Sequence, residues 1–225
     1  MSELSRKLNE MERRYFFERT IGEASGTGYI GSNTWRGWRA SPKIENAPKN
    51  ALVAAFDFLT QRFERFISQN PTPSRMDFDE FHNGEVDALF EFLQSFHSNT
   101  RIHPAAEGRY HEFAYNVYAK VVNLAYSHWC FRLQPVTGNI KYNPHLLHCF
   151  HVPIDTKVNR GIKEGIKSKL FPSPRTDIPS GGMGSIKSKH HYDEIQNYLR
   201  SIADQIPSDN FKRLSVSPLA FDDFW

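Results

Sequence analysis

Cysteine is scarce in this chain, which has two, Cys130 and Cys149, among 225 residues. Two cysteines do not make a disulfide framework. The start of the chain has no apolar signal region, and no apolar run approaches the length of a membrane span. We therefore expect a protein of the reducing cytoplasm that makes no contact with a membrane.

The sequence also lacks repeats, and no run alternates polar and apolar residues for long enough to predict a sheet. Apolar residues recur at helical spacing instead, which predicts an all-α fold of about eight helices. We expect a single all-helical domain over 1–225, with an alternative division into two lobes, about 1–100 and 101–225. The expected helices span 2–24, 46–70, 77–98 (as one helix or as two that meet at Asn83-Gly84), 107–131, 156–168, 191–206 and 219–225.

The chain as a whole has little excess charge, a formal net of +3, but its distribution is uneven. Residues 151–190 hold eight lysines or arginines against three acids, so this segment carries +5 and the rest −2. A local basic surface favours nucleic acid or another polyanion as partner. A solvated, lysine-rich helix face is the alternative interpretation.

The central motif runs from Cys149 to Arg160. An apolar stretch ends in Val152-Pro153-Ile154, and Asp155 follows it directly. Proline fixes φ and suits the last extended residues before a helix. An aspartate there is a good N-cap, because its carboxylate accepts the free N–H groups of the first turn. The same carboxylate would face any ligand that docks at that helix end, so Asp155 is either a simple cap or a functional acid.

Lys120 lies in the middle of the apolar helix predicted over 107–131. A lysine among Val117, Val121 and Leu124 either snorkels to the helix edge or is desolvated for use as an amine.

Three further stretches bear on function. The glycine-rich loop 25–42 places Trp35 and Trp38 each before an arginine, the first of them Arg36. Flat side chains beside guanidinium groups suit base stacking and phosphate pairing, whereas the alternative has both tryptophans tucked under a loop. Ser180–Gly184 lacks the spacing of a phosphate-binding P-loop and is interpreted as a mobile surface loop. The short His and Cys cluster at 145–151 is not the paired arrangement of a structural zinc site, so we expect no metal and no cofactor.

The chain resembles the helix-hairpin-helix DNA glycosylases. That family carries the signature hydrophobic-Pro-Val-Asp-Thr-His-Val-x-Arg, which residues 152–160, Val-Pro-Ile-Asp-Thr-Lys-Val-Asn-Arg, resemble. Its archaeal 8-oxoguanine branch ends the catalytic domain in Pro-Leu-His-Leu-Asp-x-x-x-Trp, and 218–225, Pro-Leu-Ala-Phe-Asp-Asp-Phe-Trp, is similar but one residue shorter. Residues 119–126 look like the helix that precedes the catalytic aspartate in that branch, so the similarity covers roughly 105–225.

The resemblance implies a helix-hairpin-helix glycosylase-like helical bundle that excises a flipped base, such as an oxidised purine, and has DNA as its partner. Asp155 would stabilise the sugar cation that develops as the glycosidic bond breaks. Asp222 would accept N–H donors of a purine edge and Trp225 would stack on it; as alternatives, these two are a helix-capping acid and a core tryptophan. The base pocket would lie between the two lobes and include Pro153. The expected DNA contacts are Lys157, Arg160, Lys163, Gly108, Arg109, Trp35 and Arg36.

The chain departs from the family at the hairpin and at the nucleophile. The hairpin near Ala105–Arg109 has one glycine where the pattern usually has two. Bifunctional members have a Schiff-base lysine just after it, but the equivalent point here falls near Tyr110 or His111. Lys120 lies two to three turns further on. It is the candidate amine for an AP-lyase activity; without it the enzyme would be monofunctional, with Asp155 activating water.

Three hypotheses therefore stand. The first is a base-excision DNA glycosylase, monomeric and nucleoid-associated in the cytoplasm. The second is a non-catalytic DNA-binding or damage-recognition module on the same fold, or a phage-type DNA base-modification protein that reuses it. The third is a helical protein-interaction domain without affinity for DNA.

Overall fold

The computed structural model describes residues 2–14, 51–94, 115–132, 144–186, 188–210 and 214–222. Within these ranges the chain is helical and contains no strand, only one isolated β-bridge between Pro207 and Ser215. The all-α class predicted from the periodicity is thus confirmed. Six α-helices are present in the described ranges: α1 (Glu3–Arg13), α4 (Ala51–Gln69), α5 (Arg75–Gln94), α7 (Tyr115–Arg132), α8 (Thr156–Lys167) and α9 (Lys189–Ala203).

Short 3-10 helices occupy three of the connections: η4 (Pro144–His148), η5 (Met183–Ser185) and η6 (Pro218–Asp222). The first two lie where only loops were expected. The third is the described part of the helix predicted over 219–225. Up to Gln94, where the description of α5 ends, the segment predicted as one or two helices over 77–98 is a single helix that continues through Gly84. Of the described helices, none is long and apolar enough to span a membrane.

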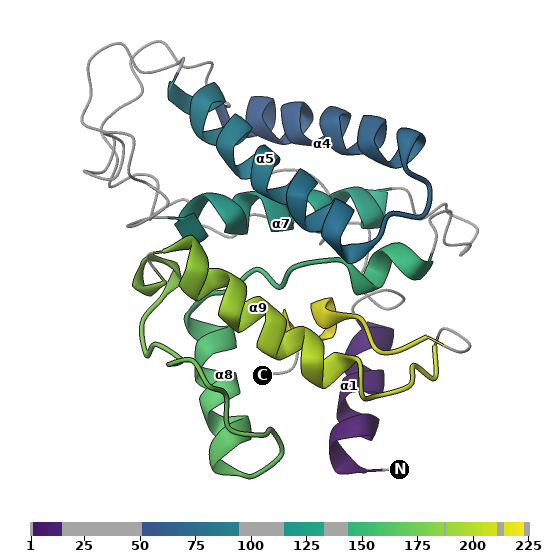
Figure 1. Ribbon diagram of the computed structural model, residues 1–225, viewed down its shortest axis with the longest axis vertical. Coiled ribbons are helices and arrows are strands. Elements are labelled where there is room, and N and C mark those ends of the chain that lie inside the picture. Colours follow the sequence, from purple (N-terminus) through teal and green to yellow (C-terminus); the bar gives the residue numbers. More distant parts are fainter. Residues whose placement is uncertain are drawn as a thin grey trace.

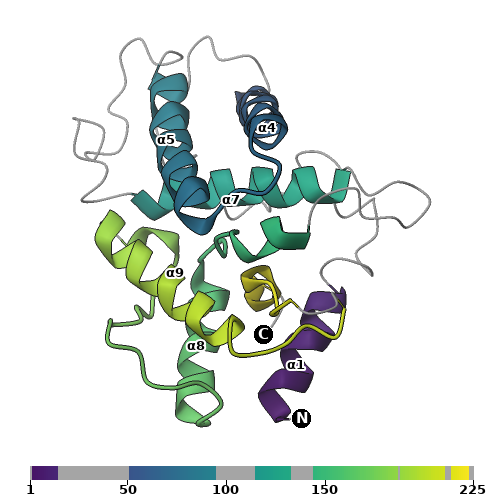
Figure 2. The ribbon, with the colours of Figure 1, turned by 45° about the vertical axis from the view of Figure 1, so that its right-hand side comes forward.

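Helix α7 lies across the middle of the molecule, with α4 and α5 on one side and α8, α9 and α1 on the other (Figures 1 and 2). Aromatic rings fill the contact between α4, α5 and α7. Phe63 stacks on Tyr126 with ring centroids 4.2 Å apart, and Phe66 stacks on Phe81 at 4.0 Å. Stacked rings of this kind add to the hydrophobic stabilisation of the core.

A buried carboxylate joins α1 to the C-terminal segment. Glu12 is fully buried and accepts hydrogen bonds from the Ser208 hydroxyl, from the Asn210 side chain and from the backbone N–H of Ser217. Burial raises the pKa of Glu12, although these donors oppose the rise. The contact fixes the start of η6, which also packs against α1.

Two glycines at helical positions give a matched test of the packing. A Cβ on Gly165 in α8 would lie 2.4 Å from the Phe171 ring, whereas a Cβ on Gly84 in α5 would have nothing within 4 Å. We expect Gly165→Ala to lower the free energy of unfolding by about 1–3 kcal/mol, because the ring must move. Gly84→Ala should raise it by up to about 1 kcal/mol through helix propensity. Urea unfolding of both variants checks the pair, and equal effects would contradict the packing of Phe171 on α8.

Candidate functional site

The segment that leads into α8 is extended and buried. Val152 and Ile154 are fully buried, and Pro153 between them is also buried. Proline excludes the helical conformation for the residue before it, and β-branched side chains favour extended backbone. The local sequence therefore delivers Asp155 at the end of an extended stretch, at the point where the helix begins.

Asp155 caps α8, as its position in the sequence predicted. Its backbone is extended, with φ −140° and ψ −169°. One carboxylate oxygen, Oδ1, accepts the backbone N–H groups of Lys157 at 2.8 Å and Val158 at 3.1 Å. These bonds satisfy two of the otherwise free donors at the helix start.

The other oxygen of Asp155 faces Lys120. The Lys120 Nζ atom lies 2.9 Å from Asp155 Oδ2, and the lysine side chain is 10% exposed while that of Asp155 is 34% exposed. The lysine therefore does not snorkel into solvent. It points from the middle of α7 to the start of α8, and the two residues, 35 positions apart in the chain, form one ion pair.

The ion pair fixes the charge of the carboxylate. Burial raises the pKa of the Asp155 carboxyl, but the charge and hydrogen bond of Lys120 and the N–H groups of Val158 and Lys157 outweigh burial. The pKa of Asp155 therefore lies below its ordinary value, and the group is ionised at neutral pH. A partly exposed carboxylate beside a primary amine offers an electrostatic stabiliser, a base and a nucleophile within one site.

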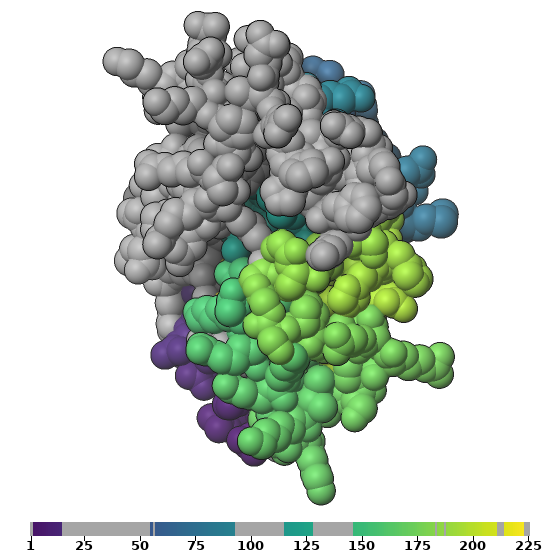
Figure 3. Space-filling view, turned by 90° about the vertical axis from the view of Figure 1, so that its left-hand side faces the viewer, coloured from purple at the N-terminus to yellow at the C-terminus, as the bar shows by residue number. Residues whose placement is uncertain are grey.

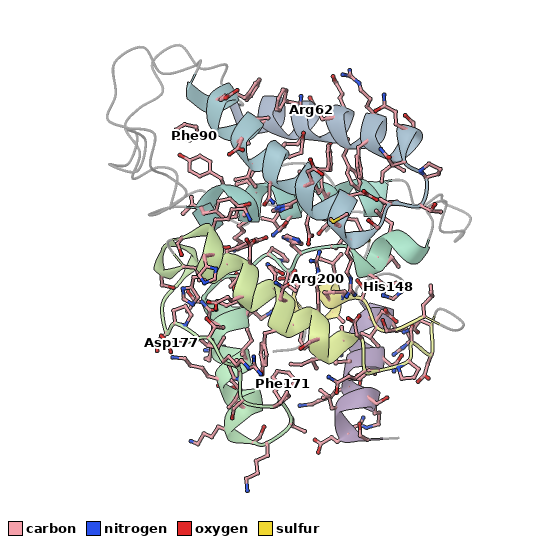
Figure 4. The ribbon with its side chains drawn as sticks, in the orientation of Figure 1. Arg62, Phe90, His148, Phe171, Asp177 and Arg200 are labelled. Carbon is pink, nitrogen blue, oxygen red and sulfur yellow. The ribbon has the colours of Figure 1, made fainter. Side chains whose placement is uncertain are left out.

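A second polar cluster, which the sequence did not predict, connects the extended segment before Asp155 to α5 and α9. His151 Nε2 lies 2.8 Å from Asp79 on α5, and its Nδ1 lies 2.9 Å from the hydroxyl of Tyr192 on α9. Arg200 on α9 pairs with the same aspartate through both terminal nitrogens at 2.8 Å and also donates to the carbonyl of Cys149. Figure 4 shows Arg200 near the middle of the molecule, where α9 faces the extended segment.

The hydrogen bonds of this cluster run in one direction. A carboxylate only accepts, so His151 carries its proton on Nε2 and donates to Asp79. Its Nδ1 then accepts the Tyr192 hydroxyl proton, and the hydroxyl oxygen accepts Nδ2 of Asn123 at 2.9 Å. The Asn123 carbonyl in turn accepts Nε2 of His82 at 2.8 Å. The two histidine rings lie 4.1 Å apart.

This direction requires a neutral His151, because its Nδ1 accepts, and burial favours the neutral form of both histidines. Burial and the charge of Arg200 lower the pKa of His151 to about 4, although Asp79 opposes the change. Burial and the neighbouring His151 hold the pKa of His82 well below its ordinary value. Burial raises the pKa of Asp79, but hydrogen bonds from His151 and Arg200 outweigh it, so Asp79 stays ionised.

The predicted DNA contacts on α8 lie on its outer face. Lys157, Arg160 and Lys163 are all exposed, whereas Val158 and Ile162 on the opposite face are buried. The green surface of Figure 3, which includes α8, covers much of the lower part of the face shown. Positively charged side chains therefore extend from the first turn of α8, next to Asp155, along its exposed side.

The loop Ser180–Ser185 lies against the same helix. Asn159 Nδ2 donates to the Gly181 carbonyl at 3.0 Å, and Lys163 Nζ donates to Ser180 Oγ at 2.5 Å. A Cβ on Gly182 would lie 2.9 Å from Thr156 Oγ1, so the loop backbone approaches the first turn of α8 closely. This segment contains η5, is bonded to α8 and packs on α7, while Gly181 and Gly184 are exposed. Its mobility stays a prediction.

The other predicted site residues are only partly described. Asp222 lies at the end of η6 and is half-buried. Gly108, Arg109, Trp35, Arg36 and Trp225 lie outside the described residues. Within the described ranges, no three His, Cys, Asp or Glu side chains gather as they would to hold a metal ion.

Comparison of this chain with protein-family models, with curated proteins and with solved structures gives no match.

Proposed function

We propose that the protein is a DNA glycosylase of the helix-hairpin-helix type that excises a damaged or modified base, such as the oxidised purine 8-oxoguanine. The observation that carries the proposal is the contact of 2.9 Å between Lys120 Nζ and Asp155 Oδ2. The signature-like segment 152–160 supplies the acid, and α7 supplies an amine beside it. Both groups are of the kind that glycosidic bond cleavage with a covalent intermediate requires.

In the bifunctional route, Lys120 is the nucleophile. The C1′–N bond breaks and its electron pair leaves with the base, which takes a proton from the Lys120 ammonium. The neutral amine then forms a bond to C1′. The C1′–O4′ bond breaks, O4′ takes a proton from the Lys120 nitrogen, and a Schiff base forms between that nitrogen and C1′. The Asp155 carboxylate stabilises the positive charge that develops on the sugar, because an anion fixed nearby lowers the energy of that state.

In the monofunctional route, water is the nucleophile. Asp155 accepts a proton from the water as the water oxygen bonds to C1′. The base leaves with the electron pair of the C1′–N bond and takes a proton from a solvent water. Lys120 then acts by holding the carboxylate ionised and in place. The two routes differ in whether a covalent protein–DNA intermediate forms, so one experiment separates them.

The basic face of α8 supports DNA as the partner. Lys157, Arg160 and Lys163 follow each other along the exposed side of the helix that Asp155 caps. Phosphates held along that face would bring the strand past the Lys120–Asp155 ion pair, and a flipped nucleotide would enter there. The proposal keeps Asp222 and Trp225 as base contacts and a monomeric, nucleoid-associated enzyme.

One observation favours the second hypothesis, a DNA-binding module without catalysis. Each charged group of the pair has the other as its partner, and Asp155 also caps α8. A salt bridge that only ties α7 to α8 would have the same geometry. Such a module would bind DNA in a salt-dependent manner and release no base.

The test is a single-turnover incubation of the full chain with end-labelled duplexes that carry 8-oxoguanine, uracil, hypoxanthine or an alkylated purine. Each reaction is divided between alkali, no alkali and borohydride. Strand cleavage only after alkali indicates the monofunctional route, and a borohydride-trapped complex indicates the amine route. DNA that is bound but intact in every reaction would favour the recognition module, or a base-modification protein whose substrate is absent from the panel.

A further inference from the structure

The extended segment before Asp155 is held by side chains in place of a sheet. The Gln196 side-chain amide accepts the N–H of Val152 at 2.8 Å and donates to the carbonyl of the same residue at 2.7 Å. Asn123 donates to that carbonyl as well, at 3.3 Å. Gln196 is 1% exposed and Asn123 is 2% exposed. Each amide therefore replaces the partner that a neighbouring strand would provide.

A third amide holds the residue next to the acid. Asn116, which is fully buried, donates through Nδ2 to the Ile154 carbonyl at 3.1 Å. Asn116, Lys120 and Asn123 are spaced i, i+4 and i+7 along α7, so they share one face of the helix. The face that holds the backbone of 152–154 is thus also the face that presents the amine to Asp155.

This arrangement sets the register of the segment. Successive extended residues rise about 3.3 Å and point to opposite sides. A slip of one residue would turn the Asp155 carboxylate away from Lys120 and bring a different side chain to the amine. A slip of one residue that brought Pro153 to Gln196 would also break this pair of bonds, because proline has no N–H to donate.

We propose that Gln196, Asn123 and Asn116 are positioning residues, which fix the register of 152–154 and so hold the Asp155 carboxylate against the Lys120 amine. The structural part of this inference stands on the contacts alone, and its consequence for base excision rests on the proposed function. These three residues do not touch the reacting atoms. They act through the backbone of 152–154, which leads directly to Asp155.

The first variant is Gln196→Met, which keeps the length of the side chain and removes both bonds to Val152. Its matched control is Asn9→Leu in α1. Asn9 makes the same kind of paired amide contact, donating to the Pro207 carbonyl at 3.1 Å and accepting the Asp209 N–H at 2.5 Å, but on another segment. Gln196→Met leaves the buried N–H of Val152 without a partner, whereas Asn9→Leu frees backbone groups of the exposed residues Pro207 and Asp209. Both variants should be less stable than the wild type, and Gln196→Met more so.

The decisive readout is the pKa of Asp155, measured by carbon-13 NMR of its carboxyl group and assigned with Asp155→Asn. Lys120→Met gives the value without the ion pair. We expect Gln196→Met to raise the pKa of Asp155 toward that value, because the carboxylate and the amine lose their alignment, and we expect Asn9→Leu to leave it unchanged. If Gln196→Met does not fold, Asn116→Ala, which releases only the Ile154 carbonyl, is measured instead.

The trapping rate with borohydride is the second readout, and it should fall about 10-fold to 100-fold in Gln196→Met but not in Asn9→Leu. A folded Gln196→Met or Asn116→Ala protein with an unchanged Asp155 pKa would overturn the positioning role, whatever the enzyme does to DNA. A shifted pKa in a protein whose wild type traps no DNA would uphold the positioning role and reject the amine route.

Discussion

The variant Asp155→Asn is expected to lower the single-turnover rate of base excision by about 10³-fold or more while its affinity for DNA stays close to that of the wild type. Asparagine is as good an N-cap as aspartate, and its Oδ1 still accepts the N–H groups of Lys157 and Val158. The substitution therefore leaves the start of α8 in place and removes only the negative charge that the sugar cation requires.

The variant also leaves Lys120 without its counter-ion. Because the Lys120 side chain is 10% exposed, Asp155→Asn should lose stability as well as activity. The double variant Lys120→Met/Asp155→Asn removes both charges, so we expect it to recover stability without recovering excision. That difference separates a catalytic defect from simple unfolding.

A matched control for the loss of one acid is Asp77→Asn. Asp77 lies in the first turn of α5, is exposed, and accepts the N–H and hydroxyl of Ser74. Its replacement should leave the excision rate unchanged. If Asp155→Asn turns over within tenfold of the wild type under the same conditions, Asp155 is not the catalytic acid and the proposed mechanism fails.

The helices and the cap of α8 were predictable because their signals are local. The apolar residues of α8 and α9, such as Val158, Ile162, Ile195 and Leu199, recur within one or two turns and all are buried. The helix α5 does not break at Asn83-Gly84. One exposed glycine costs a helix only about 1 kcal/mol, and the burial of neighbours such as Val86 offsets that cost.

The partner of Lys120 was not predictable, because the lysine meets Asp155 only after α7 and α8 pack. The sequence left two interpretations of this lysine, and the contact that decides between them joins positions 35 apart. A signal was nevertheless present. Asn116, Lys120 and Asn123 form a polar stripe on an otherwise apolar helix, and a buried polar stripe requires partners.

The cluster around His151 was hidden for the same reason. Its members come from α5, α7, the extended segment and α9. Spacing along the chain places Asp79 near His82 on α5, but only the packing of these elements brings either residue to His151. The sequence placed His151 in a short His and Cys cluster where we expected no metal, and it gave no partner for the ring. The contacts within the described ranges show it instead as a neutral residue between Asp79 and Tyr192.

The buried histidine predicts a pH-dependent stability. The pKa of His151 is lowered from 6.5 to about 4 in the folded protein. The unfolded chain therefore binds a proton near pH 6.5 that the folded protein binds only near pH 4. The contribution of neutral His151 is complete above pH 6.5 and is lost as the pH falls through this window, by about 3 kcal/mol in total.

Protonation of His151 would also break the chain of hydrogen bonds at the Tyr192 hydroxyl. A proton on Nδ1 of His151 would face the Tyr192 hydroxyl, which already accepts from Asn123 and would be left with its own proton unpaired. The new charge would lie beside Arg200 and beside the ring of His82, whose own pKa is lowered, so His82 adds to the loss in the same direction. Asp79, whose carboxylate accepts from His151, and the more distant charge of Lys189 complete its electrostatic surroundings.

His151→Gln isolates this contribution. Its amide can still donate to Asp79 but does not titrate, so we expect a protein that is less stable at pH 7 and whose free energy of unfolding changes less between pH 6.5 and 4. Buried Glu12 and Glu85, whose pKa values are raised by burial, act in the opposite sense in the lower part of this window, and the difference between wild type and variant cancels them.

His190→Gln, at a histidine whose side chain is 85% exposed, is the control and should keep the wild-type slope. Urea titrations at half-unit intervals of pH measure all three proteins, and equal slopes for wild type and His151→Gln would show that His151 does not stay neutral in the fold.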